Sequence, residues 1–281
     1  MTKKFIVQSG LYEIVPRALV RKALRLYYSA HLVYLKIMFW LDKCIGLAAK
    51  DKHRVPLRLI YKVSESLSRR EFAAVGDACA LHILKCFEAA GLDFSRSMRV
   101  LDFGCGCGRV LEPLIESFKP RQLPIEFFGV DVDGEQISWA RKHVFGADFS
   151  ECLPLPPLAY PSNYFDAVYC ISVFTHLELE TQLKWLDELN RVLRPGGVMI
   201  ISVYNLNALT HLSSSEIKAL SSSGFLFKRA SKHSGLMPDW YHTAFHSKTH
   251  FRQILEARLF SVAILEVPDG MQDFFVCRPL S

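Results

Sequence analysis

The feature of this sequence that most constrains its fold is an apolar strand that runs directly into a glycine-rich loop. The segment 100–103 is apolar apart from Asp102, and Gly104, Gly106 and Gly108 follow at every second position. Glycine permits positive φ angles and lets a ligand approach the backbone closely. When such a loop leads into a helix, it lies at the carboxyl edge of a parallel sheet, where these folds bind ligands. The feature therefore predicts an open α/β sheet with a ligand site at this loop.

Two regions of the chain differ in pattern. Residues 1–71 are basic and helical in pattern, whereas strand-like and helix-like stretches alternate from Phe72 onward. This alternation predicts a parallel sheet with helices on both faces. We therefore expect an N-terminal helical extension over residues 1–71 and one α/β domain over residues 72–281.

Hydrophobic periodicity and turn residues give the expected elements of the domain. The expected strands are 99–103, 126–130, 144–148, 166–171, 198–203, 261–266 and 273–277. The expected helices are 73–90, 108–118, 134–143, 177–193 and 248–257.

The loop spacing and its neighbours favour one class of ligand. The dinucleotide fingerprint needs a third glycine at the position held by Arg109. The observed spacing leaves room for an amino-acid tail, and acidic Asp102 suits an ammonium group better than a pyrophosphate. Asp131, after the second strand, can accept hydrogen bonds from two ribose hydroxyls. Alternatively it caps the next helix, a role that Asp133 can equally fill.

Four segments, in this order and spacing, resemble the successive motifs of class I S-adenosylmethionine-dependent methyltransferases. They are VLDFGCGCGRV, FFGVDVD, FDAVYCISVFTHL and LNRVLRPGGVMIISV. A looser likeness, from LRLIYKVSESLSRREF through YHTAFHS to MQDFFVCRP, is to a bacterial subgroup that acts in glycan or secondary-metabolite pathways. The resemblance implies a Rossmann-like sheet of seven mostly parallel strands with an antiparallel last strand. It implies S-adenosylmethionine as the cofactor.

Carried over position by position, the resemblance implies a cofactor site. Asp102, Gly104, Gly106 and Gly108 would form the methionine-binding loop, Asp131 would bind the ribose, and Ser172 and Val173 would line the pocket. The chain departs from the family pattern in ECLPLPPLAYP, where many relatives have an acidic or amide residue for the adenine amine. Asp148, Cys152 and Leu153 remain the candidates there.

The acceptor side should come from the carboxyl edge of the sheet and the C-terminal third. His176, just beyond the 166–171 strand, is our first candidate for a general base, and His242 is the second. Tyr241 and His246 are expected to bind the substrate, within a cover over 235–246. Two alternatives are open for Gln272 and Asp273: they point into the acceptor pocket, or they belong to a hairpin turn started by Asp269-Gly270.

These residues favour a methyltransferase that acts at oxygen on a small molecule or glycan. A nucleic-acid methyltransferase is the alternative enzyme. However, the chain lacks an Asn/Asp-Pro-Pro-Tyr/Phe motif after the fourth strand, and its net charge of +6 is modest. A non-catalytic module that holds the cofactor is the alternative outside the enzymes.

The cysteines and histidines predict no metal site. Eight cysteines without a secretory signal or a CxxC pair indicate reduced thiols in the cytoplasm. Cys105 and Cys107 are expected to serve as small side chains in a tight loop. His242 and His246 are four residues apart, but no acidic residue nearby completes a ligand set.

A long helix is expected over residues 18–48. Apolar residues at helical spacing include Leu24, Tyr28, Leu32, Leu35 and Phe39. We expect this helix to pack on the domain or across a homodimer. Contact with a membrane surface is the alternative, because several lysines and arginines lie close to the apolar residues.

Overall fold

A computed structural model describes residues 17–49, 55–119, 124–229, 241–258, 260–268 and 270–280. The turn predicted at Asp269 and the first part of the predicted cover, 235–240, lie outside the described residues.

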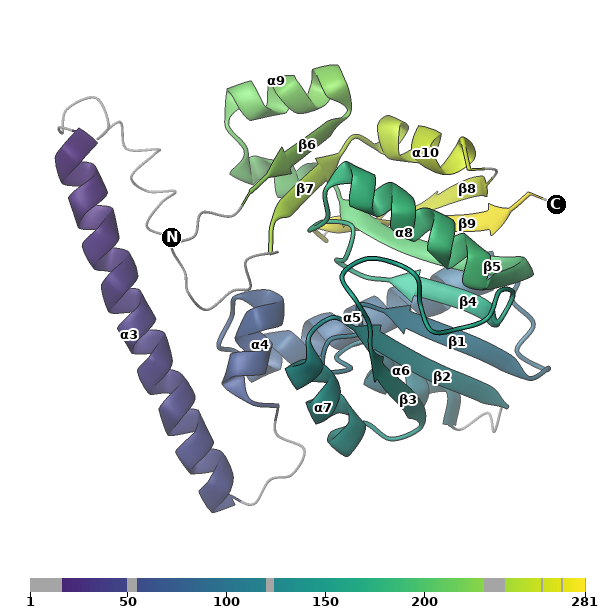
Figure 1. Ribbon diagram of the computed structural model, residues 1–281, viewed down its shortest axis with the longest axis horizontal. Coiled ribbons are helices and arrows are strands. Elements are labelled where there is room, and N and C mark those ends of the chain that lie inside the picture. Colours follow the sequence, from purple (N-terminus) through teal and green to yellow (C-terminus); the bar gives the residue numbers. More distant parts are fainter. Residues whose placement is uncertain are drawn as a thin grey trace.

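A seven-stranded sheet forms the centre of the molecule (Figure 1). Its strands are β1 (Met98–Phe103), β2 (Ile125–Asp131), β3 (Ala147–Glu151), β4 (Phe165–Cys170), β5 (Leu193–Tyr204), β8 (Phe260–Leu265) and β9 (Gln272–Pro279), in the order β3-β2-β1-β4-β5-β9-β8. The first five are parallel, and β9 is antiparallel to both of its neighbours. The predicted α/β class, with a mostly parallel sheet and an antiparallel last strand, is confirmed.

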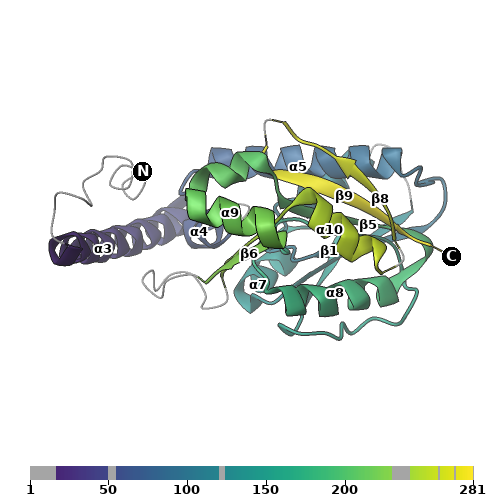
Figure 2. The same ribbon diagram turned by 90° about the horizontal axis from the view of Figure 1, so that it is seen from above.

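Helices cover both faces of this sheet. They are α5 (Arg69–Ala89), α6 (Leu111–Phe118), α7 (Gly134–His143), α8 (Leu179–Val192) and α10 (Lys248–Glu256). Figure 2 shows α5 and α8 on opposite sides of the sheet. A second, two-stranded sheet of β6 (Phe225–Lys228) and β7 (Thr243–His246) follows η2 (Leu206–His211) and α9 (Ser214–Ser223).

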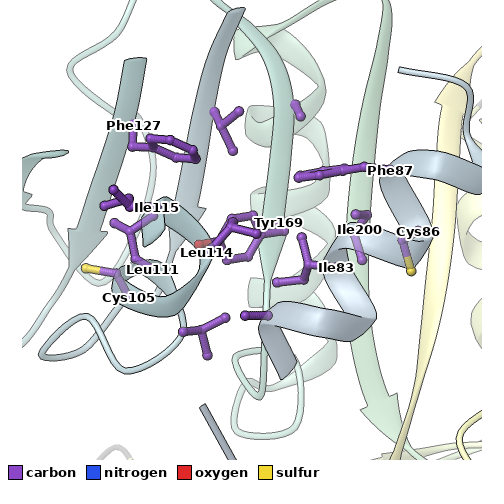
Figure 3. Packing of buried hydrophobic residues seen from close by; sticks show 14 of the residues in the cluster. Ile83, Cys86, Phe87, Cys105, Leu111, Leu114, Ile115, Phe127, Tyr169 and Ile200 are labelled. Atoms are coloured by element: carbon purple, nitrogen blue, oxygen red, sulfur yellow. The ribbon is translucent and has the colours of Figure 1, made fainter. Parts of the chain in front are cut away.

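Successive residues of the central strands feed two separate cores, because side chains alternate across a strand. In β5, Val198 and Ile200 pack with α5, α6 and α7, whereas Met199 and Ile201 pack with α8 and α10. Figure 3 shows the first core, where side chains of α5 and α6 meet Tyr169 of β4. These strands are buried on both faces, which explains their nearly continuous apolar sequences.

Several predicted boundaries were wrong: the strand expected from 198 begins at Leu193, and the helix expected from 73 begins at Arg69. Two further differences have local reasons. The helix expected from residue 108 begins at Leu111, since Gly108 has a φ of 84°, which a helix cannot contain. The strand expected at 144–148 is β3, three residues later. Val144 still belongs to the end of α7, where its N–H bonds to the carbonyl of Ala140.

Two helices precede the domain. The helix expected over 18–48 is α3 (Arg17–Ala49), and it is followed by a short helix, α4 (Leu57–Ser64). On α3, Leu35 is buried and Phe39 packs against Tyr61 of α4. Within the described residues, no helix is both long enough and apolar enough to cross a membrane.

Candidate active site

The glycine loop after β1 has the geometry that its sequence predicts. Gly104, Gly106 and Gly108 have φ angles of 81°, 54° and 84°, in the left-handed region that favours glycine. A Cβ atom on Gly104 would lie 2.3 Å from Val173, and one on Gly108 would lie 2.9 Å from Val144. A Cβ on Gly106 would have no atom closer than 3.3 Å. Gly104 and Gly108 are therefore required by packing, whereas Gly106 keeps a cavity open.

This cavity lies at the carboxyl ends of β1, β2 and β4. Of the predicted site residues, it brings together Asp102, Gly104, Gly106, Asp131, Ser172, Val173, His176 and Tyr241. Parallel strands end at one edge of the sheet, so Asp102 and Ser172, which are 70 positions apart in the sequence, meet there.

Asp102 is the most unusual group in the cavity. The residue is 2% exposed, and its buried Oδ2 atom has no hydrogen-bond partner among the described residues. Burial, with a smaller effect of the neighbouring Asp131, raises the pKa of this carboxyl from 3.8 to about 8, although the hydroxyl of Tyr169 acts in the opposite direction. A cation placed beside Asp102 would reverse this shift. The orphaned carboxylate oxygen thus fits the ammonium group of an amino-acid tail.

Asp133, and not Asp131, fills the capping role that either residue was expected to fill. Asp133 caps α7, since its Oδ1 accepts hydrogen bonds from the N–H groups of Glu135 and Gln136. Asp131 is held by the N–H of Gly106 and the N–H of Asp133, each at 2.8 Å from one carboxylate oxygen. Each oxygen keeps a further lone pair. Asp131 is therefore available at the cavity for two hydroxyl groups.

Helix α4 closes one side of the cavity, which our sequence reasoning did not predict. Lys62 and Val63 line the cavity. The ammonium of Lys62 lies 2.7 Å from Asp133 Oδ2 and 3.0 Å from Glu135 Oε2, so it ties α4 to the start of α7. The basic, helical pattern of this segment indicated a helix but did not indicate its neighbours.

Arg109 is a second residue of the cavity that sequence reasoning did not assign to the site. Its guanidinium lies 5.2 Å from the centre of the Phe72 ring. Unlike Lys62, it has no ion pair within the described ranges. Arg109 also lowers the pKa of Asp102, so the two opposite charges act at the same end of the cavity.

Ser172 follows β4 in a strained conformation that its neighbours impose. Its φ of 62° is unusual for a residue other than glycine. The N–H of Ser172 bonds to Ser202 Oγ, and its carbonyl accepts a bond from Thr175 Oγ1, both at 2.8 Å. Gln272 donates to Ser172 Oγ at 2.8 Å and accepts a bond from Ser202. Gln272 thus supports Ser172 from behind and is not among the residues that line the cavity.

His176 lies beside Ser172 and is fixed by two contacts. Its Nδ1 is 2.6 Å from the backbone carbonyl of His242. Its ring stacks on Tyr241, with 4.2 Å between the ring centres. Burial lowers the pKa of His176 below 6.5, an effect that the bond to His242 partly opposes. His176 is therefore a neutral imidazole of known orientation in the wall of the cavity.

Four other predicted residues lie outside the lining of the cavity. Gly108 faces Val144. The His242 ring packs edge-on against Phe227. His246 is buried and bonds to Gln182 through Nε2 at 2.8 Å. Asp273 is also buried, where it accepts bonds from Asn205 and from the N–H of Val267.

The loop after β3 and helix α8 also line the cavity, through Cys152, Pro154 and Trp185. Of the residues considered for adenine, Cys152 lines the cavity, whereas Leu153 is 69% exposed and Asp148 is not among the lining residues. The loop residues Cys105 and Cys107 are buried thiols whose pKa burial raises. They are protonated at neutral pH, as expected of small side chains in a tight loop.

Comparison with known proteins identifies this part of the chain. Residues 101–201 match the family model described as a methyltransferase domain. The chain is 27% identical over 139 residues to the tRNA N(3)-cytidine methyltransferase METTL2 of Danio rerio, covering 47% of this chain and 39% of that protein. It is 30% identical over 123 residues to the ubiquinone biosynthesis O-methyltransferase of Bradyrhizobium sp. (strain ORS 278), covering 42% of this chain and 45% of that protein. The chain thus spans less than half the length of either relative.

Two solved structures share the fold. The magnesium protoporphyrin IX methyltransferase (ChlM) from Synechocystis PCC 6803, with bound SAH, matches with a TM-score of 0.51 and 16% identity over 85% of this chain and 98% of that one. The CurJ carbon methyltransferase matches with a TM-score of 0.53 and 17% identity over 80% and 57%. With the family match at 101–201, this fold and this cavity show that the chain carries a class I methyltransferase domain whose cofactor is S-adenosylmethionine.

Proposed function

We propose that this domain transfers a methyl group from S-adenosylmethionine to a hydroxyl group of a small molecule or glycan, with His176 as the general base. The observation that carries the proposal is the bond between His176 Nδ1 and the carbonyl of His242. A carbonyl oxygen can only accept, so Nδ1 must hold the proton. The neutral ring then keeps an unprotonated Nε2, which has no hydrogen-bond partner in the described part of the chain.

The cavity supports a defined way to hold the cofactor. Asp102 would bind the ammonium group, and Arg109, which lies at the same end, would bind the adjacent carboxylate. Asp131 would accept hydrogen bonds from the ribose hydroxyls. Cys152, whose N–H bonds to the carbonyl of Asp131, and Trp185 also line the cavity and would flank the adenine.

When bound, S-adenosylmethionine supplies a methyl group on a positively charged sulfur, and a nucleophile in line with the carbon–sulfur bond takes this methyl group as the sulfur leaves. Most of the rate then comes from alignment of the acceptor oxygen with that methyl group. Two residues would form the rigid wall that aligns this oxygen. They are Ser172, which Ser202, Thr175 and Gln272 hold in place, and Tyr241, which stacks on His176. His176 Nε2 would accept the hydroxyl proton as the oxygen–carbon bond forms.

The test is a comparison of His176→Ala with His242→Phe, once an acceptor is found by screening for methyl transfer. His176→Ala should lower kcat by about 100- to 10,000-fold with little change in cofactor affinity. His242→Phe keeps the carbonyl that orients His176, so its kcat should stay close to that of the wild type. Because burial lowers the pKa of His176, wild-type activity should fall only at a pH below the usual histidine value of 6.5. Wild-type rates in His176→Ala would exclude the base.

A second candidate is methylation of RNA, favoured by the similarity to a tRNA N(3)-cytidine methyltransferase. A ring nitrogen with a free lone pair needs no base, so RNA methylation should survive His176→Ala. Transfer of labelled methyl groups to purified tRNA, compared with small-molecule and glycan fractions, separates the two candidates. Cofactor binding without transfer to any of these acceptors would instead support a non-catalytic module.

A further inference from the structure

Helix α3 has an apolar row along its outer surface that the described part of the protein leaves uncovered. Leu19, Leu26, Val33 and Trp40 recur every seventh residue and are 58%, 65%, 56% and 64% exposed. Ile37, which is 51% exposed, widens this row. Residues seven apart lie almost above one another on a helix. The row therefore forms an apolar stripe along the helix, and monomeric soluble proteins rarely expose large contiguous apolar patches.

The opposite side of α3 is the one that packs on the protein. Leu35 is 2% exposed, and Asp42, seven residues later, is 7% exposed. Asp42 accepts a hydrogen bond from the N–H of Leu57, at the start of α4, and pairs with Arg69. Figures 1 and 2 both show α3 outside the central sheet and its helices, next to α4. One face of α3 is thus explained by packing, whereas the apolar row is not.

The charges beside the apolar row have a single sign. Three exposed lysines follow one edge of the row, because each comes three residues after one of its members. They are Lys22, Lys36 and Lys43. The whole helix carries six lysines and arginines and one acidic residue, Asp42, which is buried and already bonded. A second copy of α3 laid along this row, in either direction, would bring lysines against lysines with no acidic residue to pair with them.

We infer that the outer face of α3 lies on an anionic lipid surface. Such a surface accepts apolar and aromatic side chains below its headgroups and offers negative charge to the lysines beside them. Trp40, Tyr27 and Tyr34 have the amphipathic rings that gather at this depth. Since no described helix is apolar enough to cross a membrane, α3 lies along the surface and does not span it.

Sedimentation of the full chain with lipid vesicles tests this inference. The protein should bind vesicles of phosphatidylcholine and phosphatidylglycerol, and should bind vesicles of phosphatidylcholine alone much less. Replacing Lys36 and Lys43 together by glutamine should weaken binding by about tenfold or more, as should added salt. The double substitution Val33→Asp, Trp40→Asp should abolish binding. Leu206→Asp, at a residue 74% exposed on the catalytic domain, is the matched control and should bind normally.

Two measurements keep the outcome decisive. Binding of S-adenosylhomocysteine by each variant shows that the domain is folded. Sedimentation equilibrium without lipid reports the oligomeric state. Equal binding to neutral and anionic vesicles, or no binding to either, would overturn the inference. If the wild type is a dimer that does not bind vesicles, and the double substitution Val33→Asp, Trp40→Asp makes it a monomer, then a second copy of the chain covers this face.

Discussion

At the scale of single residues, Asp102 carries a cost in stability that its proposed role in binding explains. The pKa of this carboxyl is 3.8 in the unfolded chain and about 8 in the folded protein. Between these two pH values, the folded protein holds the proton and the unfolded chain does not. Unfolding then releases a proton, so this group lowers stability as the pH rises from 4 toward 8. A shift of this size corresponds to about 6 kcal/mol at most.

Asp102→Asn should therefore stabilise the protein without ligand and abolish cofactor binding. The amide carries no charge to desolvate, so the gain in melting temperature over the wild type should be larger at about pH 8 than at about pH 5. Thermal unfolding measures the gain, and titration calorimetry measures binding of S-adenosylhomocysteine. Wild-type binding should also release a proton below about pH 8, because the ammonium group needs ionised Asp102. A variant that is less stable than the wild type at both pH values would contradict this account.

Gly106 allows a matched test of the glycine loop, because Gly91 has a similar φ of 62° and open space around it. Valine at either position should cost about 1 to 3 kcal/mol of folding stability through backbone strain. Only Gly106→Val places a side chain at the cavity, so it alone should abolish binding of S-adenosylhomocysteine. If folded Gly106→Val and Gly91→Val bind equally well, the loop does not hold the cofactor.

At the scale of elements, α4 depends on α3 for its first turn. Pro56, at the N-cap of α4, makes no side-chain cap, and the N–H of Leu57 instead donates to Asp42 of α3 at 2.8 Å. Asp42→Ala should lower the free energy of unfolding by about 1 to 3 kcal/mol. It should also weaken cofactor binding, since α4 carries Lys62 into the cavity.

The control for Asp42 is Asp187→Ala, which removes an exposed partner of Arg258. An exposed ion pair contributes less than about 1 kcal/mol, so stability and binding should both stay close to the wild type. Urea unfolding and calorimetry on the two variants separate the roles. Full cofactor affinity in Asp42→Ala would show that α4 holds its position without α3.

The sequence predicted the elements of the sheet far better than those around it. The central strands have strong apolar patterns, and helix α8 ends at Val192, just before the helix-stopping residues Pro195 and Gly196, which belong to β5. The pair β6 and β7 escaped prediction because four-residue strands give too short a pattern. The closure of the cavity by α4 is a tertiary contact between Lys62 and α7, which no local pattern encodes.

At the scale of the whole molecule, the candidate site was predictable where it follows strand ends. Asp102, Asp131 and His176 each come at the end of a parallel strand or just beyond it, and the topology brings them together. Residues of the C-terminal third do not obey this rule. His246 and Asp273 look equally suited to a polar pocket in the sequence, yet the fold buries both in hydrogen-bond networks.

The buried His246 gives the molecule a predictable loss of stability in acid. Burial, together with a smaller effect of the nearby His250, lowers the pKa of its ring from 6.5 to about 3. Below pH 6.5 the unfolded chain takes up a proton at this ring, whereas the folded protein does not until the pH nears 3. The contribution of the neutral ring to folding stability is therefore complete above pH 6.5 and is lost as the pH falls toward 3. The loss should reach about 2 kcal/mol by pH 5.

His246→Gln removes the titrating group and keeps an N–H donor for Gln182. The variant is expected to be less stable than the wild type above pH 7, because the glutamine fills the aromatic site between Phe225 and Phe251 poorly. Its free energy of unfolding should nevertheless fall less steeply between about pH 6.5 and pH 5, which urea denaturation at several pH values measures. Parallel curves for the two proteins would mean that other groups cause the acid sensitivity. Converging curves would show that one buried imidazole, tied to α8 through Gln182, couples the small sheet to the core.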